Sequence, residues 1–246
     1  MAQKTSSHAG KRLPNQTRRR QIIEQAIIFF AEQGFGASTR ELAERIGITQ
    51  PLLFQHFSTK QALIQAIFDT LFERMASKDW GAMLHDRNKD LRSRLIDFFS
   101  QYAAALYDNS WIRIYMFSGL AGGAFNRLYI ASVTEPLLRE VAVEIRASLG
   151  VPHSPSDVSA AETELLWILH GGLYYTAIRR HIYGMDSPST DLAQVVEAGV
   201  DSILHGMKRL AQQSKAAGAR RSRAAPTEAA GAAGPRKQRS GANLAK

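Results

Sequence analysis

Residues 38–60 of the chain read STRELAERIGITQPLLFQHFSTK and predict two short helices joined by a tight turn. Ser38 followed three residues later by Glu41 fits a capping box, in which the two side chains satisfy free amides at the start of a helix. Gly47 ends that helix, because glycine tolerates a left-handed turn that strains other residues. Thr49 is a good N-cap for a second helix, which has a proline in its first turn. The stretch therefore has the pattern of a helix-turn-helix.

The second helix of this motif has one face for the core and one face left free. At 100° per residue, Leu53 and Phe57 point inward together, whereas Pro51 and Gln55 point away. We expect the motif to span about residues 39–58 and to present a surface that is partly polar and partly apolar.

Hydrophobic periodicity predicts helices through most of the chain between its two ends. Apolar residues recur at spacings of three and four, and no alternation with period two is long enough to build a sheet. We expect an all-α fold of about nine helices, with a small three-helix N-terminal head and a larger helical body. The two ends are rich in small and basic residues, so we expect them to be disordered. The expected boundaries are 1–15 for a basic arm, 16–76 for the head, 77–213 for the body and 214–246 for a basic tail.

The chain has 246 residues, no cysteine and a net charge of +9. Without cysteine it has no disulfide, thiolate zinc site or cysteine nucleophile. Its basic charge lies at the two ends: residues 1–21 hold six cations and no acid, and residues 215–246 hold eight cations and one acid. The central part has a net charge of −4. Basic charge concentrated in this way favours a polyanionic partner.

Several classes of protein are excluded by the patterns that the sequence lacks. The longest strongly apolar stretch without charge, residues 165–178, has 14 residues, whereas a membrane-spanning helix needs about 20. The first ten residues lack the apolar run of a secretory signal. The sequence contains no glycine-rich phosphate loop, serine elbow or His-x-x-x-His metal pair. We therefore expect a cytoplasmic protein with no catalytic residues, no metal, no cofactor and no membrane partner.

Residues 16–76 resemble the DNA-binding head of the TetR/AcrR family of bacterial transcriptional regulators. The segments that carry the resemblance are 18–33, 34–35, 38–43, 47–49 and 54–63. The resemblance implies that the body binds an effector and that the last two long helices of each subunit form the interface of a homodimer. A twofold dimer reads a palindromic site in double-stranded DNA.

The resemblance also implies that the second helix of the motif enters the major groove. Gln50 then presents its amide to an adenine or guanine edge, and Pro51 and Leu52 contact a thymine methyl group. Phe54 stands where the family usually has tyrosine. Because a phenyl ring cannot donate a hydrogen bond to phosphate, we expect Phe54 to contact bases or to pack within the head. The residues expected on DNA, with hydroxyl and basic side chains on phosphates, are Ser38, Thr39, Thr49, Gln50, Pro51, Leu52, Phe54, Gln55, His56 and Lys60.

Aromatic side chains gather in the middle of the expected body. With a few polar groups they can line an apolar cavity for a small effector of unknown identity, and ordinary core packing is the alternative for each of them. Nearby arginines, among them Arg113, can bind an acidic effector, although solvation or salt bridges with glutamates are favoured. The residues expected to line the cavity are Tyr102, Trp111, Tyr115, Tyr129, Trp167, His170 and Tyr174.

Together these patterns favour a ligand-responsive transcriptional regulator, a repressor that a small and largely apolar effector releases from its operator. An architectural DNA-binding protein without an effector is the alternative, since the basic ends suit it. A helical ligand carrier whose head has lost DNA binding is a second alternative. Comparing operator with random DNA at fixed salt separates the first two, because an architectural protein shows little sequence preference.

Overall fold

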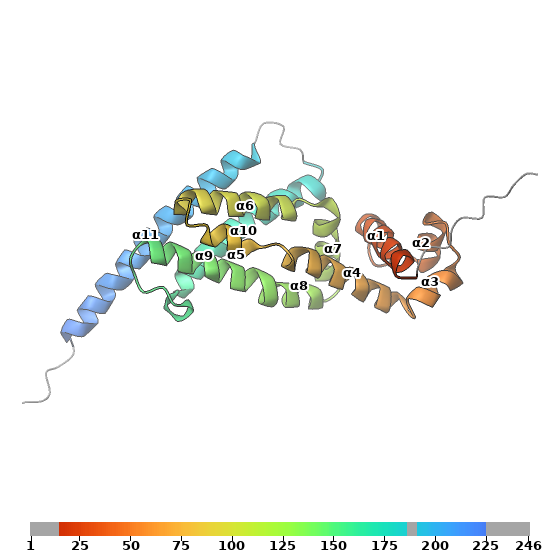
Figure 1. The fold of residues 1–246 in the computed structure, drawn as a ribbon, viewed down its shortest axis with the longest axis horizontal. Coiled ribbons are helices and arrows are strands. Elements are labelled where there is room, and N and C mark those ends of the chain that lie inside the picture. The colour runs from red at the N-terminus through yellow and green to blue at the C-terminus, as the bar shows by residue number, and fades with distance from the viewer. Residues whose placement is uncertain (1–14, 186–190, 225–246) are drawn as a thin grey trace, which may run out of the picture.

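The computed structural model describes residues 15–185 and 191–224, and every regular element within those ranges is helical (Figure 1). The all-α fold with a head and a larger body is therefore confirmed. The elements are α1 (Asn15–Gln33), α2 (Thr39–Arg45), α3 (Gln50–His56), α4 (Lys60–Ala76), α5 (Trp80–His85), α6 (Leu91–Leu106), α7 (Asn109–Leu120), α8 (Ala124–Tyr129), η1 (Ile130–Thr134), α9 (Glu135–Ser148), η2 (Pro155–Asp157), α10 (Ala160–His181) and α11 (Leu192–Ala224).

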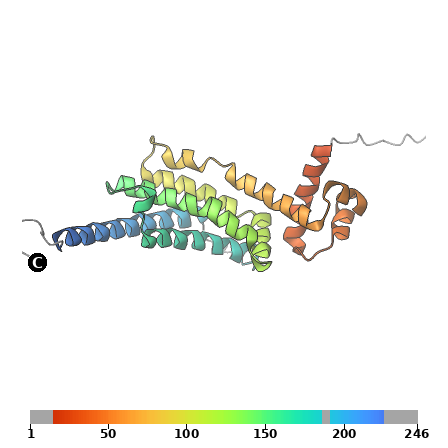
Figure 2. The same cartoon turned by 90° about the horizontal axis from the view of Figure 1, so that it is seen from below.

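The head consists of α1, α2 and α3 and lies at one end of the molecule, and α4 runs from it along the body (Figures 1 and 2). Each helix of the head contributes a fully buried side chain to one core: Phe30, Leu42 and Leu53 are at most 1% exposed. Helices of seven residues, such as α2 and α3, are marginal in water on their own. The shared core, together with the helix caps, therefore holds the motif in place.

Two buried ion pairs connect helices of the body. Arg94 on α6 lies 2.7 Å from Glu144 on α9, and Arg146 on α9 lies 2.7 Å from Glu162 on α10. Burial opposes ionisation of Glu144, but hydrogen bonds from Arg87 and Arg94 outweigh burial and lower the pKa of Glu144 to about 2. Because an unpaired buried charge is costly, each pair fixes which helices can lie side by side.

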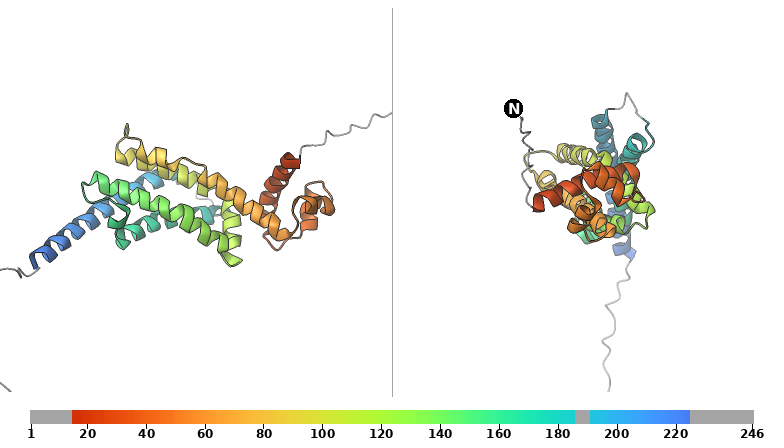
Figure 3. Two further views of the ribbon diagram at one scale, coloured as in Figure 1. Left: turned by 60° about the horizontal axis from the view of Figure 1, so that its bottom comes forward. Right: turned by 90° about the vertical axis from the view of Figure 1, so that its right-hand side faces the viewer.

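The last helix, α11, extends beyond the body as a long rod (Figures 1 and 3). It continues to Ala224, so residues 214–224 are helical where the sequence favours a disordered tail. The reason is that alanine, lysine and arginine have high helix propensity, and a helix that has already formed extends at little cost. The predicted arm before Asn15 and the rest of the tail, 225–246, lie outside the described residues. Within the described ranges, no helix has the length and apolar character needed to cross a membrane.

Candidate nucleic-acid interface and effector site

The turn between α2 and α3 is built by side chains that cap both helices. The Ser38 hydroxyl accepts a hydrogen bond from the Glu41 amide at 3.2 Å, and the Glu41 carboxylate accepts one from the Ser38 amide at 3.0 Å. Gly47 has a φ of +69°, in the left-handed region. The Thr49 hydroxyl accepts a hydrogen bond from the Leu52 amide at 3.3 Å. The predicted capping box, glycine turn and second cap are therefore all present.

Helix α3 lies at the outer edge of the head (Figure 1), and the residues on one of its faces are exposed to solvent. Leu53 is buried in the core, whereas Pro51 and Gln55 are exposed, as the helical spacing predicts. Leu52 is half-buried, and Phe54 is 38% exposed, so the ring of Phe54 lies on the surface rather than in the core. This face of α3 offers an amide, a proline ring and an aromatic ring to a partner.

Gln50 and Thr39 contact each other at the junction of the two helices. The Gln50 side chain is half-buried, and its Nε2 donates a hydrogen bond to Thr39 Oγ1 at 3.1 Å. Thr39 is only 8% exposed, so its hydroxyl faces Gln50 rather than the solvent where a phosphate would lie. Of the expected DNA-contacting residues, Thr39 is the one that the structure buries.

Two basic side chains near α3 donate hydrogen bonds to backbone carbonyls of the head. Lys60 Nζ donates a hydrogen bond to the Ala37 carbonyl at 2.7 Å. Arg19, which is absent from the set of residues expected on DNA, donates to the His56 carbonyl at 2.7 Å, and its guanidinium lies 4.2 Å from the centroid of the Phe57 ring. The run of three arginines at the start of α1 is the sequence signal for this contact. Arg19 thereby places a cation at the end of α3.

The seven residues expected at the effector site come together in the body. Tyr102 and Tyr129 are each 1% exposed and Trp111 is 3% exposed, while the other four are half-buried. The ring centroids of Trp111 and Tyr129 are 4.8 Å apart, and the Tyr102 hydroxyl lies 2.9 Å from His170 Nδ1. The cluster is therefore packed ring against ring.

Two polar atoms inside this cluster have no hydrogen-bond partner among the residues that the structure describes. They are the Tyr129 hydroxyl and Trp111 Nε1. Burial raises the pKa of Tyr129, and burial lowers the pKa of His170 to about 4. His170 is therefore neutral at pH 7, and a neutral imidazole both donates and accepts a hydrogen bond. Unpartnered buried donors are costly, and a ligand that supplies acceptors removes this cost.

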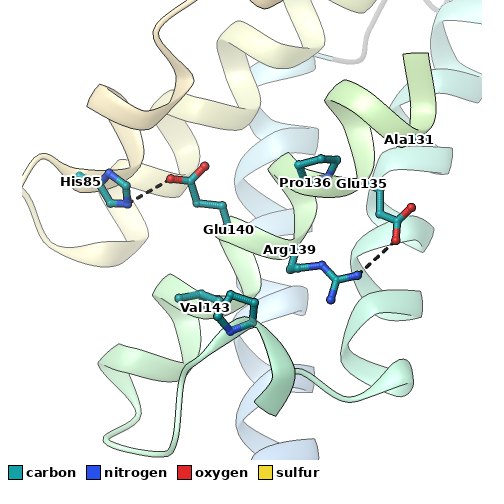
Figure 4. A pocket seen from close by; sticks show the side chains of 8 residues that line it. His85, Ala131, Glu135, Pro136, Arg139, Glu140 and Val143 are labelled. Carbon is teal, nitrogen blue, oxygen red and sulfur yellow. Dashed lines mark hydrogen bonds and ion pairs between the residues drawn. The ribbon is translucent and has the colours of Figure 1, made fainter. Parts of the chain in front are cut away.

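One cavity borders the cluster, and two others lie along α9. Trp111 lines a cavity of about 250 Å³ to which α4, α6 and α7 contribute. Two larger cavities, of about 510 and 300 Å³, share Pro136 and Glu140 and are lined by residues outside the seven. Figure 4 shows the larger one, in which His85 lies 3.2 Å from Glu140. Helical spacing alone does not distinguish the side chains that line these two cavities from those on any other polar face of a helix, so the sequence carried no signal for them.

The head and the fold resemble those of known proteins. Residues 22–67 match the family model described as bacterial regulatory proteins, tetR family. The transcriptional activator FasR of Mycolicibacterium smegmatis is 30% identical over 112 residues, which cover 42% of this chain and 51% of FasR. The class A tetracycline repressor from transposon 1721, from Escherichia coli, is 32% identical over 85 residues, which cover 31% of this chain and 39% of the repressor. The chain is therefore similar to the TetR family over residues 22–67.

Over the body as a whole, the likeness to TetR-family proteins is one of fold. A TetR-family transcriptional regulator from Mesorhizobium loti, known from its crystal structure, has a TM-score of 0.56 at 16% identity, covering 81% of this chain and 98% of that one. In sequence, by contrast, the chain matches about half or less of the length of the two curated relatives. Sequence likeness therefore covers less than half of this chain, and the chain as a whole is compared through its architecture.

Arg113 joins the head to the body. Its guanidinium donates hydrogen bonds to the carbonyls of Ala31 and Glu32 at the end of α1 and to the carbonyl of His181 at the end of α10. Carbonyls in the last turn of a helix have no partner within that helix. Arg113 therefore ties the ends of two helices together through their carbonyls, whereas the sequence favours solvation or a salt bridge with a glutamate.

Proposed function

We propose that this chain is a ligand-responsive transcriptional repressor that binds a palindromic operator as a homodimer. The observation that carries the proposal is the open face of α3 at the outer edge of the head, with Pro51, Phe54 and Gln55 exposed along it. Base contacts from such a helix specify sequence, whereas nearby cations such as Arg19 contact phosphates and set the register. The relatives support regulation of transcription, since one is named a transcriptional activator and another a tetracycline repressor.

The outer face of α10 supports the homodimer. Ile168 is 70% exposed and Tyr175 is 53% exposed, and Gly171 and Gly172 are exposed between them. Residues seven apart lie on the same side of a helix, so these four form one stripe that is apolar at its ends and has no side chain in its middle. A second copy of α10 can approach closely at the glycines and cover both large side chains.

Close packing of α10 against α11 holds this face of α10 in a fixed position. A Cβ added to Gly199 would lie 2.7 Å from Leu169, and one added to Gly206 would lie 2.6 Å from Leu165. Both distances are shorter than real Cβ contacts, so the two glycines allow α11 to pack directly onto α10. Two copies of such a helix pair form a four-helix interface, which fixes the separation of the two heads.

The aromatic cluster supports an effector site. A small, largely apolar ligand that carries hydrogen-bond acceptors would partner the Tyr129 hydroxyl and Trp111 Nε1, which have no partner within the described ranges. Trp111 and Tyr115 lie on the same helix as Arg113, which holds the end of α1. A ligand that binds one arrangement of α7 more tightly than another would therefore also favour one position of the head.

The test of operator binding begins with the full-length protein and a library of random duplex DNA. Repeated selection yields the preferred site, and fluorescence anisotropy at fixed salt compares that site with a scrambled duplex. Gln50→Ala is expected to weaken binding to the selected site about tenfold or more per half-site and to leave the scrambled duplex unchanged. Gln101→Ala, which changes an exposed glutamine of α6, is the matched control and should behave as the wild type.

A clear palindrome among the selected sites supports the proposed regulator. If the wild type binds selected and scrambled duplexes equally well, the protein is an architectural DNA-binding protein instead. If neither duplex is bound at low salt, the head has lost DNA binding and the chain is a ligand carrier.

Sedimentation of two matched variants tests the dimer. Ile168→Glu places a charge on the exposed face of α10 and is expected to give a monomer, because burying an unpaired carboxylate is costly. Leu128→Glu changes a leucine of α8 that is 57% exposed, away from that face, and should sediment as the wild type does. Equal masses for Ile168→Glu and the wild type would place the dimer interface elsewhere.

A further inference from the structure

Ser38, Thr39 and Thr49 place three hydroxyl side chains at the starts of α2 and α3, and their hydrogen bonds differ. The hydroxyls of Ser38 and Thr49 accept amide hydrogens and cap α2 and α3. Thr39 is the first residue of α2, and its hydroxyl oxygen instead accepts a hydrogen bond from Gln50 Nε2 at 3.1 Å. Thr39 is 8% exposed, so this contact is largely shielded from water. The hydroxyl of Thr39 is thus engaged with the first side chain of α3.

The hydrogen bond to Thr39 restricts what the Gln50 amide can offer to DNA. A primary amide has two N–H donors and one carbonyl acceptor. With one N–H donated to Thr39, one donor and one acceptor remain. In the major groove adenine presents one acceptor, N7, and one donor, the N6 amine, whereas guanine presents two acceptors, N7 and O6. The remaining donor and acceptor of Gln50 complement adenine, and guanine would place its O6 opposite the amide oxygen.

We propose that Thr39 is a positioning residue that makes Gln50 read adenine and reject guanine at one position in each half-site. This inference rests on the proposed binding of an operator by α3. Thr39 acts through Gln50 and need not touch DNA, in keeping with its burial. A glutamine held in one orientation also loses less side-chain freedom when it meets a base, which favours binding of the matching site.

Base preference, rather than affinity alone, is the quantity that tests this role. The full-length protein and its variants are titrated by fluorescence anisotropy against the selected operator and against duplexes that carry each of the other base pairs at single positions. The wild type is expected to prefer adenine over guanine about tenfold at the position that Gln50 reads. Thr39→Val keeps the shape of the side chain without its hydroxyl and should reduce this preference to about twofold, mainly by binding guanine better. Thr39→Ser keeps the hydroxyl and should restore the preference.

Two further variants separate positioning from a structural role. In a Gln50→Ala background, Thr39→Val should cause no additional change in base preference, because the side chain through which it acts is absent. Thr70→Val removes a half-buried hydroxyl of α4 that donates to the Ala66 carbonyl at 2.8 Å and should leave base preference intact. Thermal unfolding confirms that each variant is folded, and Thr39→Ala replaces Thr39→Val if the valine variant is not.

The possible failures are distinguishable from one another. If Thr39→Val weakens all duplexes by the same factor and keeps the ratio of adenine to guanine, the hydroxyl serves only to hold α2 and α3 together, and the inference is overturned. If Gln50→Ala leaves every base preference unchanged while the wild type is still sequence-specific, Gln50 reads no base, and the inference fails although the proposed function stands. If the wild type has no sequence preference, the proposed function itself fails.

Discussion

Replacing Arg113 by methionine removes the guanidinium that joins the head to the body and keeps an apolar side chain of similar length. The wild-type side chain donates to the carbonyls of Ala31, Glu32 and His181, which belong to the ends of two different helices. A hydrogen bond from a charged donor contributes about 1.5–3 kcal/mol. Because Arg113 is half-buried, water replaces part of the loss. We expect the free energy of unfolding to fall by about 2 kcal/mol, which lowers the melting temperature of a chain of this size by about 4–8 °C.

Differential scanning calorimetry and urea unfolding of the wild type and Arg113→Met measure this loss. Arg127→Met is the matched control, since Arg127 also donates to a backbone carbonyl, that of Gly122 at 2.8 Å, but within its own turn. We expect the control to lose less than about 0.5 kcal/mol, as is usual for surface substitutions. If the Arg113 contacts are what makes the head and the body unfold cooperatively, the variant also melts in two steps, one for each part. Equal losses for the two variants would refute the role of Arg113 as the link between head and body.

Three further perturbations follow from the packing. Gly34→Ala places a methyl group at a φ of +75° and 3.2 Å from the Phe117 ring of α7. Urea unfolding should show that the free energy of unfolding falls by about 1–2 kcal/mol. An unchanged midpoint of urea unfolding would contradict the expected strain. Glu144→Gln leaves Arg94 buried without its carboxylate and should cost about 3–5 kcal/mol in the same assay, whereas a loss below about 1 kcal/mol would mean that the pair is dispensable. His170 has a pKa lowered to about 4 from 6.5, so in the folded state it stays unprotonated where the unfolded chain binds a proton. The contribution of neutral His170 to the free energy of unfolding is therefore complete above pH 6.5, and the free energy falls by about 3 kcal/mol as the pH drops toward 4. Urea unfolding of the wild type and His170→Phe across this pH range checks this loss. Identical dependence of the free energy of unfolding on pH in the two proteins would argue against it.

The helix-turn-helix was predictable in detail because its signals are local. Ser38 and Glu41 are three residues apart, and Gly47 and Thr49 act on their immediate neighbours, so the chain order alone specifies the caps and the turn. The inward direction of Leu53 follows from the helical period in the same way. The clustering of the expected aromatic residues was predictable as a group, because helices bury their large apolar side chains together.

The contacts that give these elements a function join residues far apart in the chain. Thr39 and Gln50 are 11 positions apart, and Arg113 reaches Ala31 across 82 positions. Similarly, the burial of Thr39 and the exposure of Ile168 depend on which helices pack against them. A pattern of three and four residues specifies a helix and its apolar face, because those interactions lie within one or two turns. Which helix faces pack against each other depends on the tertiary structure of the whole chain. The same packing decides which polar atoms are buried and which stay exposed.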